Sequence, residues 1–166
     1  SEEKALGYLR AMLKSYRDGN DNAKPDSFIF NCIITMLARS NSKESTLSAY
    51  KTLMAMENQQ RSGNTSVAPD TITYNTVLGK LARFPSKESA KKAMALLNTM
   101  EEGLTGSNTA IAPDILTYTT IVRLQEKIGD SRRAANIASS YLQRLVSNED
   151  EKLHVDRFGL RALLMA

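Results

Sequence analysis

The chain has one cysteine, one histidine and no tryptophan among its 166 residues. A single cysteine excludes an internal disulfide, and Cys32 with His154 supplies too few ligands for a zinc site built from cysteine and histidine. Cys32 lies in the apolar stretch IFNCII, so we predict a small buried thiol at this position. The sequence therefore predicts neither a disulfide nor a zinc site.

Long apolar runs and catalytic groupings are missing as well. No stretch approaches the roughly eighteen apolar residues that span a bilayer, and the N-terminal SEEKALGYLRAML lacks the order of a secretory signal. Because no acidic cluster, nucleophile-base grouping or phosphate-binding glycine loop is present, we expect no enzyme, cofactor or metal. We expect the chain to belong to a longer protein, with any targeting peptide upstream.

Aromatic residues make up 6% of the chain, and alanine, leucine and methionine provide most of its apolar character. This composition suits closely packed helices better than a sheet, so we predict an all-α fold. The 22 basic and 18 acidic side chains leave a net charge of +4. Such a balance permits a polyanionic partner without requiring one.

A 44-residue repeat runs through most of the chain. The segments AKPDSFIFNCIITMLAR, VAPDTITYNTVLGKLAR and IAPDILTYTTIVRLQEK align without gaps and begin 44 residues apart, at Ala23, Val67 and Ile111. A fixed period of this length indicates stacked units. We predict one array over 1–166: the second helix and loop of a preceding repeat at 1–25, repeats at 26–69, 70–113 and 114–155, and the first helix of a truncated repeat at 156–166.

Each repeat contains two predicted helices. Apolar residues at helical spacing mark the first: Phe30, Ile33, Ile34 and Leu37; Tyr74, Val77, Leu78 and Leu81; Tyr118, Ile121 and Val122, where Gln125 weakens the last place. Alanine with leucine or methionine marks the second: Ala5, Leu9 and Met12; Ala49, Leu53 and Met56; Ala93, Leu97 and Met100. One hairpin cannot bury its apolar stripe alone, so we expect antiparallel hairpins in a right-handed α-α superhelix, a solenoid.

Polar residues predict where these helices begin. An aspartate after proline is the expected N-cap of each first helix, and Ser42, Ser86 and Asp130 are the expected N-caps of the second helices. The stretches NQQRSGNTS and EGLTGSNT, which precede the next Pro-Asp, are predicted to be flexible loops.

The strings APDTITYNTVLGKLAR and APDILTYTTIV, the latter followed by KIGD, resemble the pentatricopeptide repeat family. The match combines Pro-Asp, two residues, Thr-Tyr-Asn, an apolar pair, leucine and a basic residue. The period of 44 residues is longer than is usual in the family, and we assign the extra residues to the inter-repeat loop and, in the first two copies, to the turn within the hairpin. The resemblance implies a groove lined by the first helices that binds one nucleotide per repeat.

By this resemblance, the base-reading residues are Asn31, Asn75 and Thr119, each paired with the aspartate that opens the next repeat: Asp70, Asp114 and Asp156. Each reader follows the buried aromatic position and points roughly 100° away from the core stripe, so we expect it to be accessible. The resemblance implies uridine for the first two pairs and guanosine for the third. The alternatives are an inherited polar residue without function, and aspartates that only cap helices.

Two further columns follow the repeat. The resemblance implies that Phe28, Ile72, Leu116 and Phe158 sandwich the bases, and one cation per repeat, Arg39, Arg83 and Lys127, matches the phosphates. The alternatives are apolar contact with the neighbouring repeat, and cations that stabilise the C-terminal end of the helix dipole.

The predicted function is single-stranded RNA binding, by family habit in a mitochondrion or plastid, for RNA processing, stability or translation. We expect no membrane and no small-molecule substrate as partners. A protein-protein interaction scaffold of the same fold is the alternative, because helical solenoids commonly bind peptides.

Overall fold

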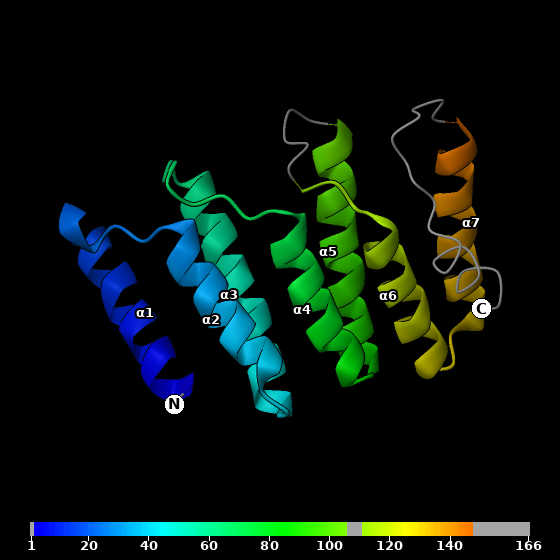
Figure 1. Ribbon diagram of the computed structural model, residues 1–166, viewed down its shortest axis with the longest axis horizontal. Helices are drawn as coiled ribbons and strands as arrows, with labels where there is room; N and C mark the ends of the chain where they lie inside the picture. The colour runs from blue at the N-terminus through cyan, green and yellow to red at the C-terminus, as the bar shows by residue number, and fades with distance from the viewer. Residues whose placement is uncertain (1, 106–110, 148–166) are drawn as a thin grey trace. The chain divides into compact units, whose positions relative to one another are not determined.

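The computed structural model describes residues 2–105 and 111–147, and every regular element in these ranges is helical (Figure 1). The elements are α1 (Glu2–Arg17), the short 3-10 helix η1 (Asp21–Ala23), α2 (Ser27–Arg39), α3 (Lys43–Arg61), α4 (Thr71–Arg83), α5 (Lys87–Thr105), α6 (Ile115–Lys127) and α7 (Ser131–Ser147). The predicted all-α class is confirmed. The predicted truncated repeat at 156–166 lies outside the described residues. None of the described helices is long and apolar enough to cross a bilayer.

The helices follow the repeat in their order and lengths. The first helices α2, α4 and α6 have 13 residues each, and the second helices α3 and α5 have 19. The chain divides into two compact units, Ser1–Lys80 and Leu81–Ala166, because most residue contacts are made within one unit or the other. The boundary between the units falls inside α4. Each unit has a core of its own.

The core of the first unit is built on α2 and α3. These helices run in opposite directions, joined by a short turn, and α1 contacts α2 (Figure 1). The predicted stripes are buried, and the core contains Leu9, Phe30, Ile33, Ile34, Leu37, Ala49, Leu53, Met56, Val67, Tyr74, Val77 and Leu78. Burial of each large apolar side chain contributes about 1.5–3 kcal/mol. The predicted stripe of α1 is less complete, because Ala5 and Met12 are only half-buried.

The core of the second unit lies where α6 contacts both α5 and α7. It contains Leu81, Ala90, Ala93, Leu96, Leu97, Met100, Ile111, Tyr118, Ile121, Val122, Leu124, Ala134, Ile137, Ala138 and Tyr141. The rings of Tyr118 and Tyr141 stack, with centroids 4.4 Å apart and planes inclined by 28°. Aromatic stacking of this kind adds about 0.5–1.5 kcal/mol to the effect of burial.

All six predicted N-caps are confirmed by side chains that accept a hydrogen bond from the backbone three residues later. Asp26, Asp70 and Asp114 cap the first helices at 2.8–2.9 Å, and Ser42, Ser86 and Asp130 cap the second helices at 3.0–3.1 Å. Each such cap stabilises its helix by about 1 kcal/mol.

The extra residues of the long repeat are partly helical, which corrects the predicted assignment to loops. Asn58 to Arg61 belong to α3, and Glu102 to Thr105 belong to α5. After α3, Gly63 adopts a φ of 91°, which suits glycine, and its N–H donates to the Gln60 carbonyl at 3.0 Å. Part of the extra length of the repeat therefore lies in its second helix.

The loop between α3 and α4, which the sequence predicted to be flexible, is hydrogen-bonded to the segment that precedes α2. The buried Asn64 donates from Nδ2 to the Pro25 carbonyl at 3.0 Å. The Ser27 N–H donates to the Ser66 carbonyl at 3.1 Å, and the Ala68 N–H donates to Ser27 Oγ at 2.8 Å. These hydrogen bonds hold the segment that precedes Asp70 against the start of α2.

Cys32 is exposed, so the prediction of a buried thiol is also wrong. The buried stripe of α2 is centred between Ile33 and Ile34, and at 100° per residue Cys32 lies about 150° from that centre. The apolar residues next to Cys32 in the sequence suggested burial, whereas its angular position on the helix decides its exposure.

Candidate nucleic-acid interface

An exposed apolar side chain stands near the start of each described first helix. Phe28, Ile72 and Leu116 are 74%, 75% and 56% exposed. Single exposed apolar residues are common on proteins, but these three recur at one position of the repeat. In α2 and α4 they lie three residues before Asn31 and Asn75, on the same helix face. Phe158, the predicted fourth member, lies outside the described residues.

The first predicted reading pair is brought together inside the first unit. The hydroxyl of Thr73 lies 2.9 Å from Asn31 Oδ1 and 2.8 Å from Asp70 Oδ1. The backbone N–H of Thr73 also donates to Asp70 Oδ1, at 2.8 Å. Thr73 is buried, whereas Asn31 and Asp70 are half-buried. The structure thus connects the two predicted residues through a third that the sequence analysis did not single out.

The other two pairs are less complete. Asn75 is half-buried in the first unit, whereas Asp114 caps α6 in the second. Thr119 is buried, against the expectation that it is accessible, and its hydroxyl donates to the Ile115 carbonyl at 2.8 Å. A short hydroxyl side chain that folds back onto its own helix lies low on the helix surface. Its predicted partner, Asp156, lies outside the described residues.

The predicted cations are exposed at the C-terminal ends of the first helices. Arg39, Arg83 and Lys127 are the last residues of α2, α4 and α6, and all three are exposed. Arg123 is also exposed on α6. Within residues 2–105 and 111–147, neither Arg39 nor Lys127 has an ion pair. These two charges are available to an anionic ligand.

Each unit contains a tyrosine-glutamate hydrogen bond that the sequence analysis missed. Tyr74 donates to Glu57 Oε1 at 2.5 Å in the first unit, and Tyr118 donates to Glu101 Oε1 at 3.0 Å in the second. Burial, followed by the hydrogen bond to Glu57, raises the pKa of Tyr74 above its ordinary value. Both members follow the 44-residue step, and this shared spacing was the signal that could have identified them.

Lys80 is a further residue whose role the sequence did not indicate. Its side chain is buried, and Nζ donates to the carbonyl of Ser40, the C-cap residue of α2. A cation at a helix C-terminus satisfies an unpaired carbonyl and interacts favourably with the helix dipole. Lys80 therefore joins α4 to the end of α2, at the opposite end of these helices from Thr73.

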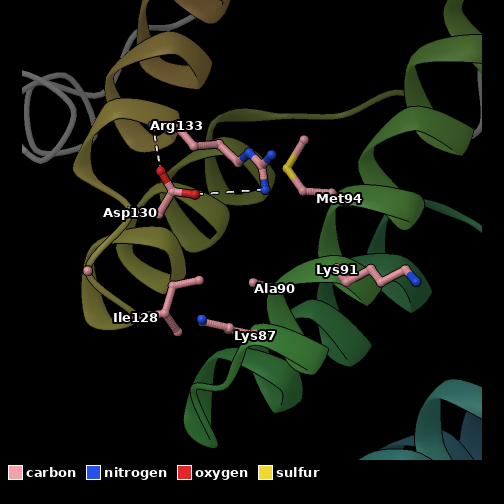
Figure 2. A pocket seen from close by; sticks show the side chains of 8 residues that line it. Lys87, Ala90, Lys91, Met94, Ile128, Asp130 and Arg133 are labelled. Carbon is pink, nitrogen blue, oxygen red and sulfur yellow. Dashed lines mark hydrogen bonds and ion pairs between the residues drawn. The ribbon is translucent and has the colours of Figure 1, made fainter.

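A cavity of about 630 Å³ lies in the second unit. Its walls come from α5, α7 and the turn after α6, and include Ala90, Met94 and Ile128. Figure 2 shows Lys87 and Arg133 reaching into it from opposite walls, whereas Lys91 points away. Arg133 also pairs with Asp130 at 3.8 Å. The cavity combines an apolar wall with the cations Lys87 and Arg133 and the carboxylate of Asp130.

No protein-family model, curated protein or solved structure matches the chain. Within the part of the chain that the structure describes, no group of three or more His, Cys, Asp or Glu side chains could hold a metal ion. The repeat and the geometry of the first helices are therefore the features that bear on function.

Proposed function

We propose that the chain forms a right-handed superhelix of helix hairpins that binds single-stranded RNA along the exposed face of its first helices. The resemblance of its repeats to the pentatricopeptide family suggests the ligand. The structure adds support in the first unit, where the residues that the resemblance assigns to one base lie close together.

The observation on which the proposal depends is the arrangement around Asn31. Phe28 is 74% exposed and lies one helical turn before Asn31, while Thr73 connects Asn31 to Asp70. On α4, Ile72 occupies the repeat position that Phe28 occupies on α2. A base between Phe28 and Ile72 would meet the amide of Asn31 at its edge.

In this arrangement each type of side chain has one task. Stacking on an aromatic side chain contributes about 1–3 kcal/mol per base, and it tolerates any sequence because every base has a π-face. The half-buried Asn31 amide both donates and accepts hydrogen bonds, so it distinguishes base edges. Arg39 and Lys127 attract the phosphates, which makes binding sensitive to salt.

The resemblance gives the base order UUG, with the first uridine at Asn31 and Asp70, the second at Asn75 and Asp114, and the guanosine at Thr119 and Asp156. It also suggests an organelle, a mitochondrion or plastid, and a role in RNA processing, stability or translation. Because Thr119 is buried, the guanosine is proposed on the resemblance alone.

The proposal is tested by fluorescence anisotropy with labelled single-stranded RNA that contains UUG, against a scrambled RNA of the same composition. We expect preferential binding of UUG and an affinity that falls as salt rises. Phe28→Ala should weaken binding about 5- to 150-fold, because one stacking platform is lost. Tyr8→Ala is the matched control, since Tyr8 is an aromatic residue of similar exposure, 75% against 74%. It lies on α1, which corresponds to the second helix of a repeat and is outside the proposed RNA-binding face.

A local probe is provided by Cys32, which is exposed on α2 four residues after Phe28. Bound UUG RNA should slow alkylation of this single thiol, whereas the scrambled RNA should not. Equal binding of both RNAs, or equal loss in the two alanine variants, contradicts recognition through this face.

The alternative function, a protein-interaction scaffold, is favoured by the cavity of about 630 Å³ with Lys87 and Arg133 in the second unit. Its mixed apolar and cationic walls suit an acidic peptide with an apolar side chain. This alternative predicts no saturable RNA binding even at low salt. It also predicts that Lys87→Glu with Arg133→Glu abolishes binding of a peptide of alternating glutamate and leucine.

A further inference from the structure

The hydroxyl of Thr73 can donate only one hydrogen bond but lies near two acceptor oxygens. It lies 2.9 Å from Asn31 Oδ1 and 2.8 Å from Asp70 Oδ1, and both of these oxygens are acceptors. A threonine hydroxyl donates one hydrogen bond and accepts up to two. One of the two contacts would therefore place two oxygens together without a proton between them.

The hydroxyl should donate to the Asp70 carboxylate, because hydrogen bonds to ionised acceptors are about twice as strong as those between neutral groups. Rotating the Asn31 amide by half a turn exchanges its oxygen and nitrogen and leaves every other atom in place. The amide N–H then donates to Thr73 Oγ1, which donates to Asp70 Oδ1. Every contact now has a donor and an acceptor.

We propose that Thr73 is a positioning residue that transmits the charge of Asp70 to Asn31 and holds the Asn31 amide in one of its two orientations. The chain of hydrogen bonds runs from Asn31 to Thr73 to Asp70. It directs the amide oxygen away from Thr73. The burial of Thr73 strengthens this control, because water does not compete for its hydroxyl.

The consequence for RNA recognition rests on the function proposed above. With one N–H given to Thr73, the amide presents its oxygen and its other N–H side by side, as an acceptor and a donor in fixed order. Uracil and cytosine have similar shapes but opposite orders, since uracil offers O4 and N3–H where cytosine offers an amine and N3. A held amide therefore matches only one pyrimidine, the proposed uridine, whereas a free amide rotates to match either.

A comparison of the copies shows that the hydroxyl is not required for the helix to form. Thr117 repeats the arrangement in α6, where its hydroxyl lies 2.9 Å from Asp114 Oδ1. In α2 the same place is taken by Ile29, and the Asp26 cap remains, with the Ile29 N–H donating to Asp26 Oδ1 at 2.9 Å. An aliphatic β-branched residue therefore fits this position, and Thr73→Val should fold.

The test compares two RNAs that differ in one base, UUG and CUG in the same flanking sequence, on the full chain. The unaltered chain should prefer UUG about fivefold or more, as expected for a bidentate contact. Thr73→Val should bring the ratio to about one, mainly by improving CUG binding, and Thr73→Ser should restore the preference. Thr52→Val is the control, because Thr52 is equally buried, at 3%, and its hydroxyl bonds only within α3.

A second measurement needs no RNA. In NMR spectra the side-chain amide of Asn31 should show one slowly exchanging proton in the unaltered chain and in Thr52→Val, and none in Thr73→Val. A rapidly exchanging Asn31 amide in the unaltered chain overturns the proposal, as does an unchanged base preference in Thr73→Val. Absence of RNA binding by the unaltered chain, with the protected amide present, contradicts the proposed function and leaves the hydrogen-bond chain established.

Discussion

The two units share a tyrosine-glutamate hydrogen bond but place the glutamate in different surroundings. In the first unit Glu57 is buried, accepts from Tyr74 at 2.5 Å and pairs with Arg61 at 2.6 Å. In the second unit Glu101 is only partly buried, and Tyr118 donates to it at 3.0 Å. The same two residue types at the same spacing therefore differ in how much a lost partner should cost.

A second difference lies in the last place of the buried stripe. Leu37 and Leu81 fill it in α2 and α4, whereas α6 has Gln125. Gln125 is fully buried, and neither polar atom of its amide has a hydrogen-bond partner among the described residues. From the sequence, Gln125 was expected to weaken the stripe, but the structure buries it as completely as the leucines. A repeat tolerates such a substitution at a cost in stability.

The largest expected effect is the loss of the Tyr74 hydroxyl. Tyr74→Phe should lower the free energy of unfolding by about 2–3 kcal/mol, because a buried carboxylate loses a hydrogen bond, and Tyr118→Phe should lower it by about 1 kcal/mol. Urea unfolding followed by circular dichroism measures both values. Phe30 occupies this place in α2, which indicates that the ring alone fits. Equal losses would show that the burial of Glu57 does not distinguish the units.

Replacement of Gln125 should give a smaller change of opposite sign. Gln125→Leu should raise the free energy of unfolding by about 1–2 kcal/mol, because it removes two unsatisfied buried polar atoms. Gln125→Glu, which has the same shape but adds a charge, should lower it. A loss of stability in Gln125→Leu would contradict the expectation that the buried amide is unsatisfied. Thermal unfolding of the three chains gives the comparison.

The smallest expected effect is a dependence on alkaline pH. Burial and the bond to Glu57 raise the pKa of Tyr74 above its ordinary value of 10.0. Because the folded phenol keeps its proton when the unfolded one loses it, this contribution is complete below pH 10 and is lost as pH rises further. Between pH 8 and pH 10.5 the unaltered chain should lose about 0.8 kcal/mol more than Tyr74→Phe. Parallel pH profiles would contradict the raised pKa.

Much of the fold could be predicted because it depends on local spacing. The stripe from Phe30 to Leu37 and the caps at Asp26, Ser42 and Asp130 follow from helical geometry, and the structure confirms them. Burial of Cys32 was wrongly predicted because the prediction considered its apolar neighbours in the sequence and not its angular position on the helix. The helical extension of α3 to Arg61 was missed because polar residues and glycine nearby suggested a loop.

The candidate site was predictable only in part. The sequence marked Phe28, Asn31 and Asp70 through the family resemblance, and Phe28 is exposed as that role requires. Thr73 was not singled out, because its importance depends on two residues that are 42 and 3 positions away along the chain. The burial of Thr119 was missed because a helical angle alone does not reveal a hydroxyl folded back onto its helix.

By itself, the sequence determined the helices, their caps and the 44-residue repeat, because these depend on residues close together in the chain. The tertiary structure decided what those repeated positions do. It buried Glu57 and Lys80, left the Gln125 amide without a hydrogen-bond partner among the described residues, and placed the hydroxyl of Thr73 between Asn31 and Asp70. The physical reason is that burial and hydrogen-bond partners are set by residues from different helices, whose approach no local pattern records.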